Sequence, residues 1–391
     1  MKKVIFSTLL FMFAVVLYGQ SSKVNTAYAN YTHAADDLRN NELNKAIESL
    51  NEAVENIEPA ILDSKTSVKS KTWKYRGNIY SMISGIETMR EKYPDAVKTA
   101  VDSYVKAMEL DTKGSDKNEI MKQLKTIHDS EFQNGNDAFG EQKFDIAINF
   151  YKNSILIFES MGLVDSVSYF NGALAADNGK FYDVALENYL GAARIGYQDV
   201  YCYNRAMIIL KDQEKYDEAI AISNEAIALY PQNNDLIIAQ LNIFLAADMF
   251  EDAEPEMEQA VLDKPDDPTM WFALAVVKDN LNKVDEAKAA YEKSLEIDPQ
   301  FFNSNLNLAI LYFNKASKMI EAANEIPAKE VDKYNAAIKE AKAQLSKAVP
   351  YFEAAYAVTP NRSILMDLKE AYGQLGDSAN YKRVKEILDS E

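Results

Sequence analysis

The segment Tyr216-Asp217-Glu218-Ala219-Ile220 contains the alanine on which the fold prediction rests. Alanine recurs every 34 residues, at Ala185, Ala219, Ala253 and Ala287. Fixed offsets from these alanines match as well: four residues later stand Tyr189, Ser223, Met257 and Tyr291, and seven residues later stand Ala192, Ala226, Ala260 and Ser294. Pro231, Pro265 and Pro299 each follow twelve residues after an alanine. A fixed period of this length predicts repeated pairs of helices, which small residues hold close and prolines end.

The other half of the repeat is clearest in Trp73-Lys74-Tyr75-Arg76-Gly77-Asn78-Ile79-Tyr80. Together with the alanine-to-proline half, this segment resembles the tetratricopeptide repeat (TPR) pattern W-x2-L-G-x2-Y…A-x3-F…P, with Arg76 in place of leucine. The resemblance covers nearly all of the chain after residue 19. It implies an all-α fold, a right-handed superhelical solenoid of about nine helix-turn-helix units.

The expected units differ in regularity. They lie near 27–60, 70–112, 128–160, 166–199, 200–233, 234–267, 268–301, 302–361 and 362–391, and the last one is expected to be a cap. Residues 84–97 form an insertion in the second unit. In the eighth, residues 315–347 predict a lengthened helical hairpin with Pro327 in its turn.

The hairpin 315–347, called the arm below, contains seven lysines and five acids, whereas the whole chain has a net charge of −18. One interpretation is a pair of solvated helix faces. The other is a projecting arm that docks on an acidic partner or joins two protomers. The basic connector 64–74 allows the same two interpretations.

Composition restricts the chemistry. The 60 acidic residues exceed the 42 basic ones, which argues against a nucleic-acid partner. A single cysteine, Cys202, excludes an internal disulfide and a cysteine-based metal cluster, and we expect it to be a small packed side chain. His33 and His128 lie far apart in sequence, so a His-based triad or metal site is not expected. We predict no catalytic residue, no metal site and no cofactor, and therefore no enzyme.

The N-terminus has the pattern of a secretory signal peptide over residues 1–19: Lys2 and Lys3, the apolar stretch Val4 to Leu17, and a small residue at Gly19. An uncleaved anchor is the alternative. The chain is similar in these respects to secreted TPR proteins of Gram-negative bacteria. We therefore expect an exported protein, periplasmic, envelope-associated or secreted, with no stable membrane span after cleavage.

Front helices line the concave face in the family that the chain resembles. Counted from Ser166, Val200, Asn234 and Pro268, their fifth, ninth and thirteenth positions give the candidate binding residues: Phe170, Leu174, Asn178, Asn204, Ile208, Ile238, Asn242, Phe272, Val276 and Asn280. Apolar pockets beside asparagine amides suit an extended peptide. The alternative is that the apolar members are core between neighbouring units. Arg205 and Lys211 alone do not form the basic carboxylate clamp of chaperone-binding TPR proteins.

These patterns predict an exported, non-enzymatic scaffold for protein–protein interaction that binds an extended peptide or partner segment on its concave face. The alternative is a structural or assembly component of a cell-envelope complex that acts through self-association or as a secretion or transport accessory. The partner's identity does not follow from the sequence.

Overall fold

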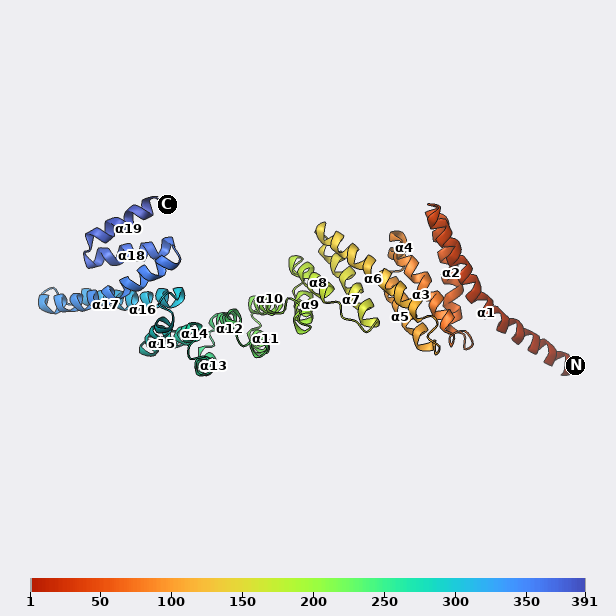
Figure 1. The fold of residues 1–391 in the computed structure, drawn as a ribbon, viewed down its shortest axis with the longest axis horizontal. Coiled ribbons are helices and arrows are strands. Elements are labelled where there is room, and N and C mark those ends of the chain that lie inside the picture. Colours follow the sequence, from red (N-terminus) through yellow and green to blue (C-terminus); the bar gives the residue numbers. More distant parts are fainter. Residues whose placement is uncertain (1, 391) are drawn as a thin grey trace. The chain divides into compact units, whose positions relative to one another are not determined.

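The structure is a computed structural model that describes residues 2–390, with side chains described from Ser21 to Ser390. The expected leader, residues 1–19, lies outside the residues whose side chains are described. Two compact units divide the chain at Ala206 and Met207, and each is considered by itself. Every regular element in the described range is a helix, which confirms the predicted all-α helical solenoid (Figure 1).

The helices of the first unit, in chain order, are α1 Lys2–Arg39, α2 Leu43–Leu62, α3 Ser70–Ser84, α4 Glu87–Lys92, α5 Ala96–Leu110, α6 Lys117–Gly140, α7 Phe144–Ser160, α8 Ser166–Asn178 and α9 Tyr182–Arg194. The boundary between the units lies within α10, Asp199–Asp212. The second unit continues with α11 Tyr216–Leu229, α12 Asn234–Ala247, α13 Phe250–Asp263, α14 Pro268–Asn280, α15 Val284–Ile297, α16 Phe302–Asn324, α17 Val331–Val358, α18 Arg362–Leu375 and α19 Ser378–Ser390.

The residues that carry the period have the predicted roles. The alanines Ala185, Ala219, Ala253 and Ala287 are all fully buried. Pro231, Pro265 and Pro299 stand just after the ends of α11, α13 and α15. At the start of α14, the Asp267 side chain accepts a hydrogen bond from the Thr269 backbone N–H, and Pro268 occupies the first turn. Helix α14 therefore begins at its capping residue, and α11, α13 and α15 each end just before a proline.

The front half of the repeat works through a close approach of two helices. Gly77 of α3 faces the Tyr104 ring of α5, and a Cβ added at Gly77 would lie 2.6 Å from that ring's Cδ1. Tyr104 is fully buried and donates a hydrogen bond to Asn78 Oδ1 at 2.8 Å. Glycine is required here because a side chain would occupy the space of the tyrosine ring.

The insertion 84–97 folds as the short helix α4 and is held against the following helices. Arg90 donates a hydrogen bond to Glu131 Oε1 at 2.9 Å, and its guanidinium lies 4.8 Å from the centre of the Phe150 ring. Glu131 is 1% exposed and also accepts a hydrogen bond from Asn153 at 2.7 Å. Burial raises the pKa of the Glu131 carboxyl against the opposing effect of Arg90. The insertion is thus tied to α6 and α7.

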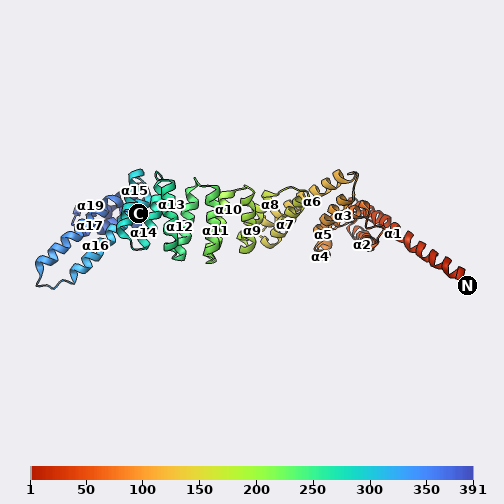
Figure 2. The same ribbon diagram turned by 90° about the horizontal axis from the view of Figure 1, so that it is seen from below.

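The lengthened hairpin is confirmed. Helices α16 and α17 run side by side, and Pro327 lies in the turn that joins them (Figures 1 and 2). Ala316, Leu345 and Ala371 form a buried cluster at the base of the arm, whereas Val331 and Tyr334 near its tip are 57% and 38% exposed. Lys315, Lys318, Lys329, Lys339, Lys342 and Lys347 have no ion pair with a carboxylate among the described residues.

A buried lysine joins three helices of the second unit. Lys278 of α14 is 6% exposed. Its Nζ binds Glu254 and Glu258 of α13, the latter at 2.6 Å, and Glu286 of α15 at 3.0 Å. The adjacent carboxylates raise the pKa of Lys278 in spite of its burial. Lys278 therefore acts as a charged link between successive helix pairs.

Candidate binding surface

The candidate residues of α8 lie along one helix face. Phe170, Leu174 and Asn178 follow one another at intervals of four residues; the first two are half-buried and Asn178 is exposed. The Phe170 ring contacts two tyrosines, Tyr197 and Tyr201, with ring centres 5.7 Å and 5.8 Å away. Tyr201 is 45% exposed. The first unit thus presents a partly exposed aromatic cluster of Phe170, Tyr197 and Tyr201.

Sequence analysis missed Tyr197 and Tyr201 as members of this cluster. Tyr201 stands three residues before the candidate Asn204, one helical turn away, so it shares a face of α10 with it. That spacing was available from the sequence. Tyr197 stands before α10, and only the folded arrangement brings it to Phe170.

A polar pair adjoins the aromatic cluster. Arg205 Nη2 binds Asp177 Oδ2 at 2.6 Å, and the Tyr189 hydroxyl donates to the same oxygen at 3.1 Å. Burial and the Asp177 charge raise the pKa of Tyr189. Arg205 is therefore engaged within its own unit, and in the second unit Lys211 pairs with Asp212 at 2.7 Å. That these two cations do not form a carboxylate clamp stays a prediction.

The candidates of the second unit differ in exposure. Ile208 is 38% exposed on α10, Ile238 is half-buried on α12, and Asn242 is exposed. On α14, Phe272 and Val276 are only 8% and 9% exposed and belong to the main core of this unit.

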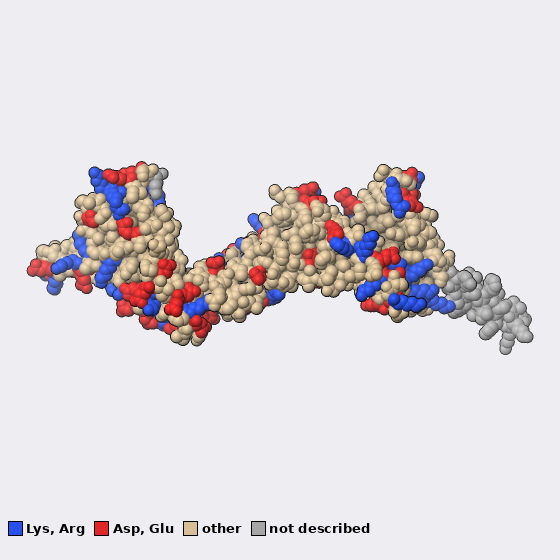
Figure 3. Space-filling model, viewed as in Figure 1, with Lys and Arg blue, Asp and Glu red and all other residues tan. Residues whose placement is uncertain are grey.

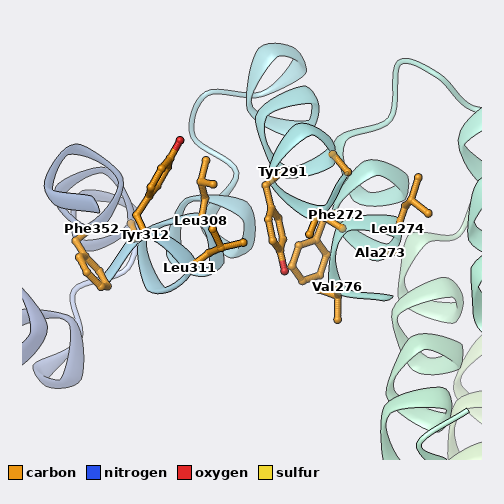
Figure 4. Close-up of a cluster of buried hydrophobic side chains, with 14 of the residues drawn as sticks. Phe272, Ala273, Leu274, Val276, Tyr291, Leu308, Leu311, Tyr312 and Phe352 are labelled. Carbon is orange, nitrogen blue, oxygen red and sulfur yellow. The ribbon is translucent and has the colours of Figure 1, made fainter. Parts of the chain in front are cut away.

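Phe272 and Val276 therefore behave as core. Figure 4 shows the Phe272 ring of α14 beside Tyr291 of α15, and Phe301 lies 5.8 Å from Phe272, centre to centre. For these two positions the packing interpretation describes the contacts better than the groove interpretation. Their value as binding residues stays an unconfirmed prediction.

Two of the four candidate asparagine amides, those of Asn178 and Asn280, donate to carbonyls of their own helices. Asn178 Nδ2 donates to the Leu174 carbonyl at 2.7 Å, and Asn280 Nδ2 donates to the Val276 carbonyl at 2.8 Å. Both side chains are exposed, as is Asn242, while Asn204 is half-buried. These amides reach solvent, so they do not owe their positions to a buried partner. A bound peptide would meet them at the rim of the apolar positions.

The two histidines differ in burial. His33 is exposed on α1. His128 is 8% exposed and lies in the middle of α6, which begins at Lys117. Its Nε2 lies 2.7 Å from Asp165 Oδ2, its Nδ1 lies 3.1 Å from Asp129 Oδ1, and its ring stacks on Phe158 at 3.7 Å.

This arrangement leaves no imidazole nitrogen to accept a proton from a hydroxyl, because both nitrogens face carboxylates. The two carboxylates raise the pKa of His128 although burial opposes the shift. Asp165 also accepts a hydrogen bond from the Ser168 backbone N–H at the start of α8. The pair therefore joins α6 to α8 as a structural contact.

Cys202 is fully buried, and its Sγ lies 3.6 Å from the Tyr197 carbonyl oxygen. Burial and the Asp199 charge raise the pKa of the thiol to about 12. The thiol is protonated at neutral pH, which is the behaviour of a packed side chain rather than a nucleophile. Among the residues with described side chains, no group of three His, Cys, Asp or Glu side chains is placed to hold a metal ion.

The last helix pair contains a shallow pocket of about 400 Å³. It is lined by Met366, Lys369, Glu370, Gly373, Gln374 and Tyr381. Tyr381 occupies the position where the other units have a small residue. Its ring contacts Gly373, and Lys369 Nζ lies 6.0 Å from the ring centre.

The basic connector is only partly solvated. Lys74 pairs with Asp116 at 2.7 Å and Glu119 at 3.0 Å, and Arg76 pairs with Glu58 at 2.8 Å. Lys65 and Lys69 are exposed. Within residues with described side chains, no helix is both long and apolar enough to span a bilayer.

Two protein-family models match the helix pairs in the middle of the chain. One tetratricopeptide repeat model matches residues 268–301, and a second matches residues 210–277. Residues 210–301 therefore consist of tetratricopeptide repeats. The matched TPR segments cover α11 to α15, where the alanines recur most regularly.

Several solved TPR structures are similar to parts of the chain. A TPR repeats protein from Bacteroides fragilis shares 19% sequence identity with this chain, and the two superpose with a TM-score of 0.36. The match covers 63% of this chain and 98% of the Bacteroides chain. MamA from Desulfovibrio magneticus shares 16%, with coverage of 50% and 97% and a TM-score of 0.33. YrrB, described as a TPR protein with an unusual peptide-binding site, shares 19%, with coverage of 53% and 92% and a TM-score of 0.32. No curated protein matches the chain.

Proposed function

We propose that this TPR protein is a non-enzymatic scaffold that binds an extended segment of a partner protein along the front helices. The aromatic cluster of Phe170, Tyr197 and Tyr201 carries the proposal. Aromatic rings that are partly exposed supply large contact area with few rotamers to immobilise, and such residues dominate protein interfaces. The exposed amide of Asn178 stands on the same helix face and offers a donor and an acceptor to a peptide backbone.

The test compares two exposed tyrosines of the first unit. Tyr201 is 45% exposed in the aromatic cluster, and Tyr182 is 40% exposed at the start of the back helix α9. Peptides selected from a displayed random library on the wild-type protein are labelled, and their affinity is measured by fluorescence anisotropy. We expect Tyr201→Ala to weaken binding by at least tenfold, whereas Tyr182→Ala leaves it unchanged. Equal effects of the two substitutions would refute the proposed surface.

The partner in the cell is found with a photo-crosslinking amino acid at position 201 and, as the control, at position 182. Adducts are identified by mass spectrometry. A partner of the front helices crosslinks from position 201 and not from 182. Identical adducts from both positions would contradict the proposal.

We further propose export to the periplasm, envelope or exterior. The sequence of residues 1–19 supports this proposal, with two lysines, an apolar stretch and a small residue before the expected cleavage point. The check is the N-terminal sequence of the isolated protein together with cell fractionation. Protein that begins at Met1 and fractionates with cytoplasm would show that the proposal is wrong.

The arm supports a second candidate function, assembly of an envelope complex through self-association. Val331 and Tyr334 are exposed near its tip, and six of its lysines lack carboxylate partners among the described residues. Substituting Val331→Ser and Tyr334→Ser leaves the buried base of the arm intact. If the arm joins protomers, light scattering shows a smaller particle for this variant than for the wild type. An unchanged mass with peptide binding intact favours the peptide scaffold alone.

A further inference from the structure

Two loops of the first unit meet at one end of its helices. The loop before α3 touches the loop before α6, because Ser70 Oγ donates a hydrogen bond to Asp116 Oδ2 at 3.2 Å. Lys71 Nζ reaches Asn25 Oδ1 of α1 at 3.4 Å. The segments 62–71 and 111–117 and the part of α1 around Asn25 therefore form one continuous surface, called the lysine end below.

The lysine end is rich in lysines that form no close ion pair, although the Lys65 backbone N–H and then the Lys65 charge contribute to lowering the pKa of Asp63 two residues away. Its exposed lysines are Lys65, Lys69, Lys71, Lys113 and Lys117, and none of them forms an ion pair with a carboxylate within the described part of the chain. The acids beside these lysines accept bonds from other groups, and among them Asp111 accepts the Asp116 backbone N–H at 2.6 Å. Asp116 and Glu119 bind Lys74, and Asp63 accepts the backbone N–H groups of its own loop at 3.0 and 3.2 Å. Figure 3 shows Lys and Arg gathered at this end of the unit, on the right of the view.

Two aliphatic side chains project among these lysines. Leu62 is 84% exposed and Val68 is 64% exposed. The loop that carries them is braced from within, because buried Thr66 donates to the Ala60 carbonyl and the Trp73 indole N–H donates to the Ser67 carbonyl at 2.7 Å. The loop thus holds Leu62 and Val68 toward solvent by its own hydrogen bonds.

We propose that the lysine end docks onto an anionic membrane surface. Lysine ammonium groups are attracted to anionic headgroups, and aliphatic side chains beside them enter the boundary between headgroups and acyl chains. The rest of the chain favours this orientation, because a protein of net charge −18 is repelled by an anionic surface everywhere except at a basic patch. The apolar stretch Val4 to Leu17 precedes Asn25 closely in sequence, so a chain delivered by that stretch presents the lysine end first.

The test uses the purified protein and sedimenting vesicles of phosphatidylcholine, with or without 30 mol% phosphatidylserine, at about 0.1 M salt. Wild type binds the anionic vesicles more tightly than the neutral ones. Each lysine near an anionic surface contributes about fivefold to the partition coefficient. The triple variant Lys65→Gln, Lys69→Gln, Lys71→Gln should therefore bind anionic vesicles about 100-fold more weakly than the wild type. The variant Leu62→Ser, Val68→Ser loses about tenfold through its missing apolar contact and keeps the salt dependence of the wild type.

The matched control makes the same charge change elsewhere, at Lys329→Gln, Lys339→Gln and Lys342→Gln in the arm. It keeps wild-type partition if the lysine end is the docking surface. The substituted side chains are exposed except for half-buried Lys342, and Lys71 loses only its hydrogen bond to Asn25 and its contact with the Tyr75 ring. The circular dichroism melting curves of the variants should therefore stay close to that of the wild type. Equal binding of wild type to neutral and anionic vesicles would overturn the proposal. A loss in the arm control as large as that in the lysine-end variant would overturn it as well.

Discussion

The buried lysine of the second unit makes a quantitative prediction about how successive helix pairs are held together. Replacing Lys278 with methionine keeps an unbranched side chain that is one atom shorter and removes its charge. Glu254 and Glu258 of α13 then face Glu286 of α15 without the cation that lies between them. Lys283, which also binds Glu254, remains to offset part of their repulsion.

The size of the effect follows from the exposure of each partner. Removing one member of a fully buried ion pair costs about 3–5 kcal/mol, whereas an exposed pair contributes about 0–1 kcal/mol. The Glu254 side chain is 18% exposed, but those of Glu258 and Glu286 are 53% and 60% exposed and regain water when the lysine is lost. We therefore expect Lys278→Met to lower the free energy of unfolding by about 2 kcal/mol, below the fully buried case.

Urea unfolding followed by circular dichroism measures the change, with hydrogen exchange of the peptides from α13 to α15 to locate it. The control is Lys293→Met, which removes an i,i+3 pair with Glu296 whose side chains are 46% and 66% exposed. This control should cost less than about 0.5 kcal/mol. The reasoning is refuted if Lys278→Met is as stable as the wild type, or if faster exchange is spread over the whole unit instead of these helices.

Two further predictions concern the first unit. Because the pKa of His128 is raised above its ordinary value in the folded state, its stabilisation is complete below about pH 6.5 and is lost as pH rises through the raised value. The melting temperature of the wild type should therefore approach that of His128→Gln between pH 6 and 9. Gly77→Ala places a methyl group 2.6 Å from the Tyr104 ring and should cost about 1–3 kcal/mol in urea unfolding, while Gly140→Ala, whose added carbon meets no atom within 4 Å, should be neutral. A loss of less than about 1 kcal/mol for Gly77→Ala would show that the Tyr104 ring can move aside.

Much of the fold could be predicted because its determinants are local. A buried alanine such as Ala219 recurs at a fixed interval, and Pro231 stands just after the end of α11, the helix that contains Ala219. Both signals are visible in the linear sequence. The hairpin was predictable for the same reason, since Pro327 is the lone helix breaker in a long polar stretch.

The exposure of the candidate binding residues was harder to predict from the sequence. Helical spacing puts Phe170 and Phe272 on equivalent faces, but it does not tell whether a neighbouring helix covers that face. Phe301 and Tyr291 cover Phe272, whereas Phe170 keeps a partly exposed cluster. The hydrogen bond between Arg90 and Glu131 joins residues 41 positions apart, because the insertion packs against α6. The repeat period does not predict this contact.

The lone cysteine gives this protein a native reporter of local opening. Cys202 lies fully buried in α10 with a thiol pKa of about 12, so a thiol reagent in solution cannot modify it until the helix opens. When labelling is slow relative to reclosing, its rate gives the opening free energy of α10 from the wild-type chain, with no probe engineered into it. Repeating the measurement with a bound peptide would show whether a ligand stiffens the helix that also carries Tyr201.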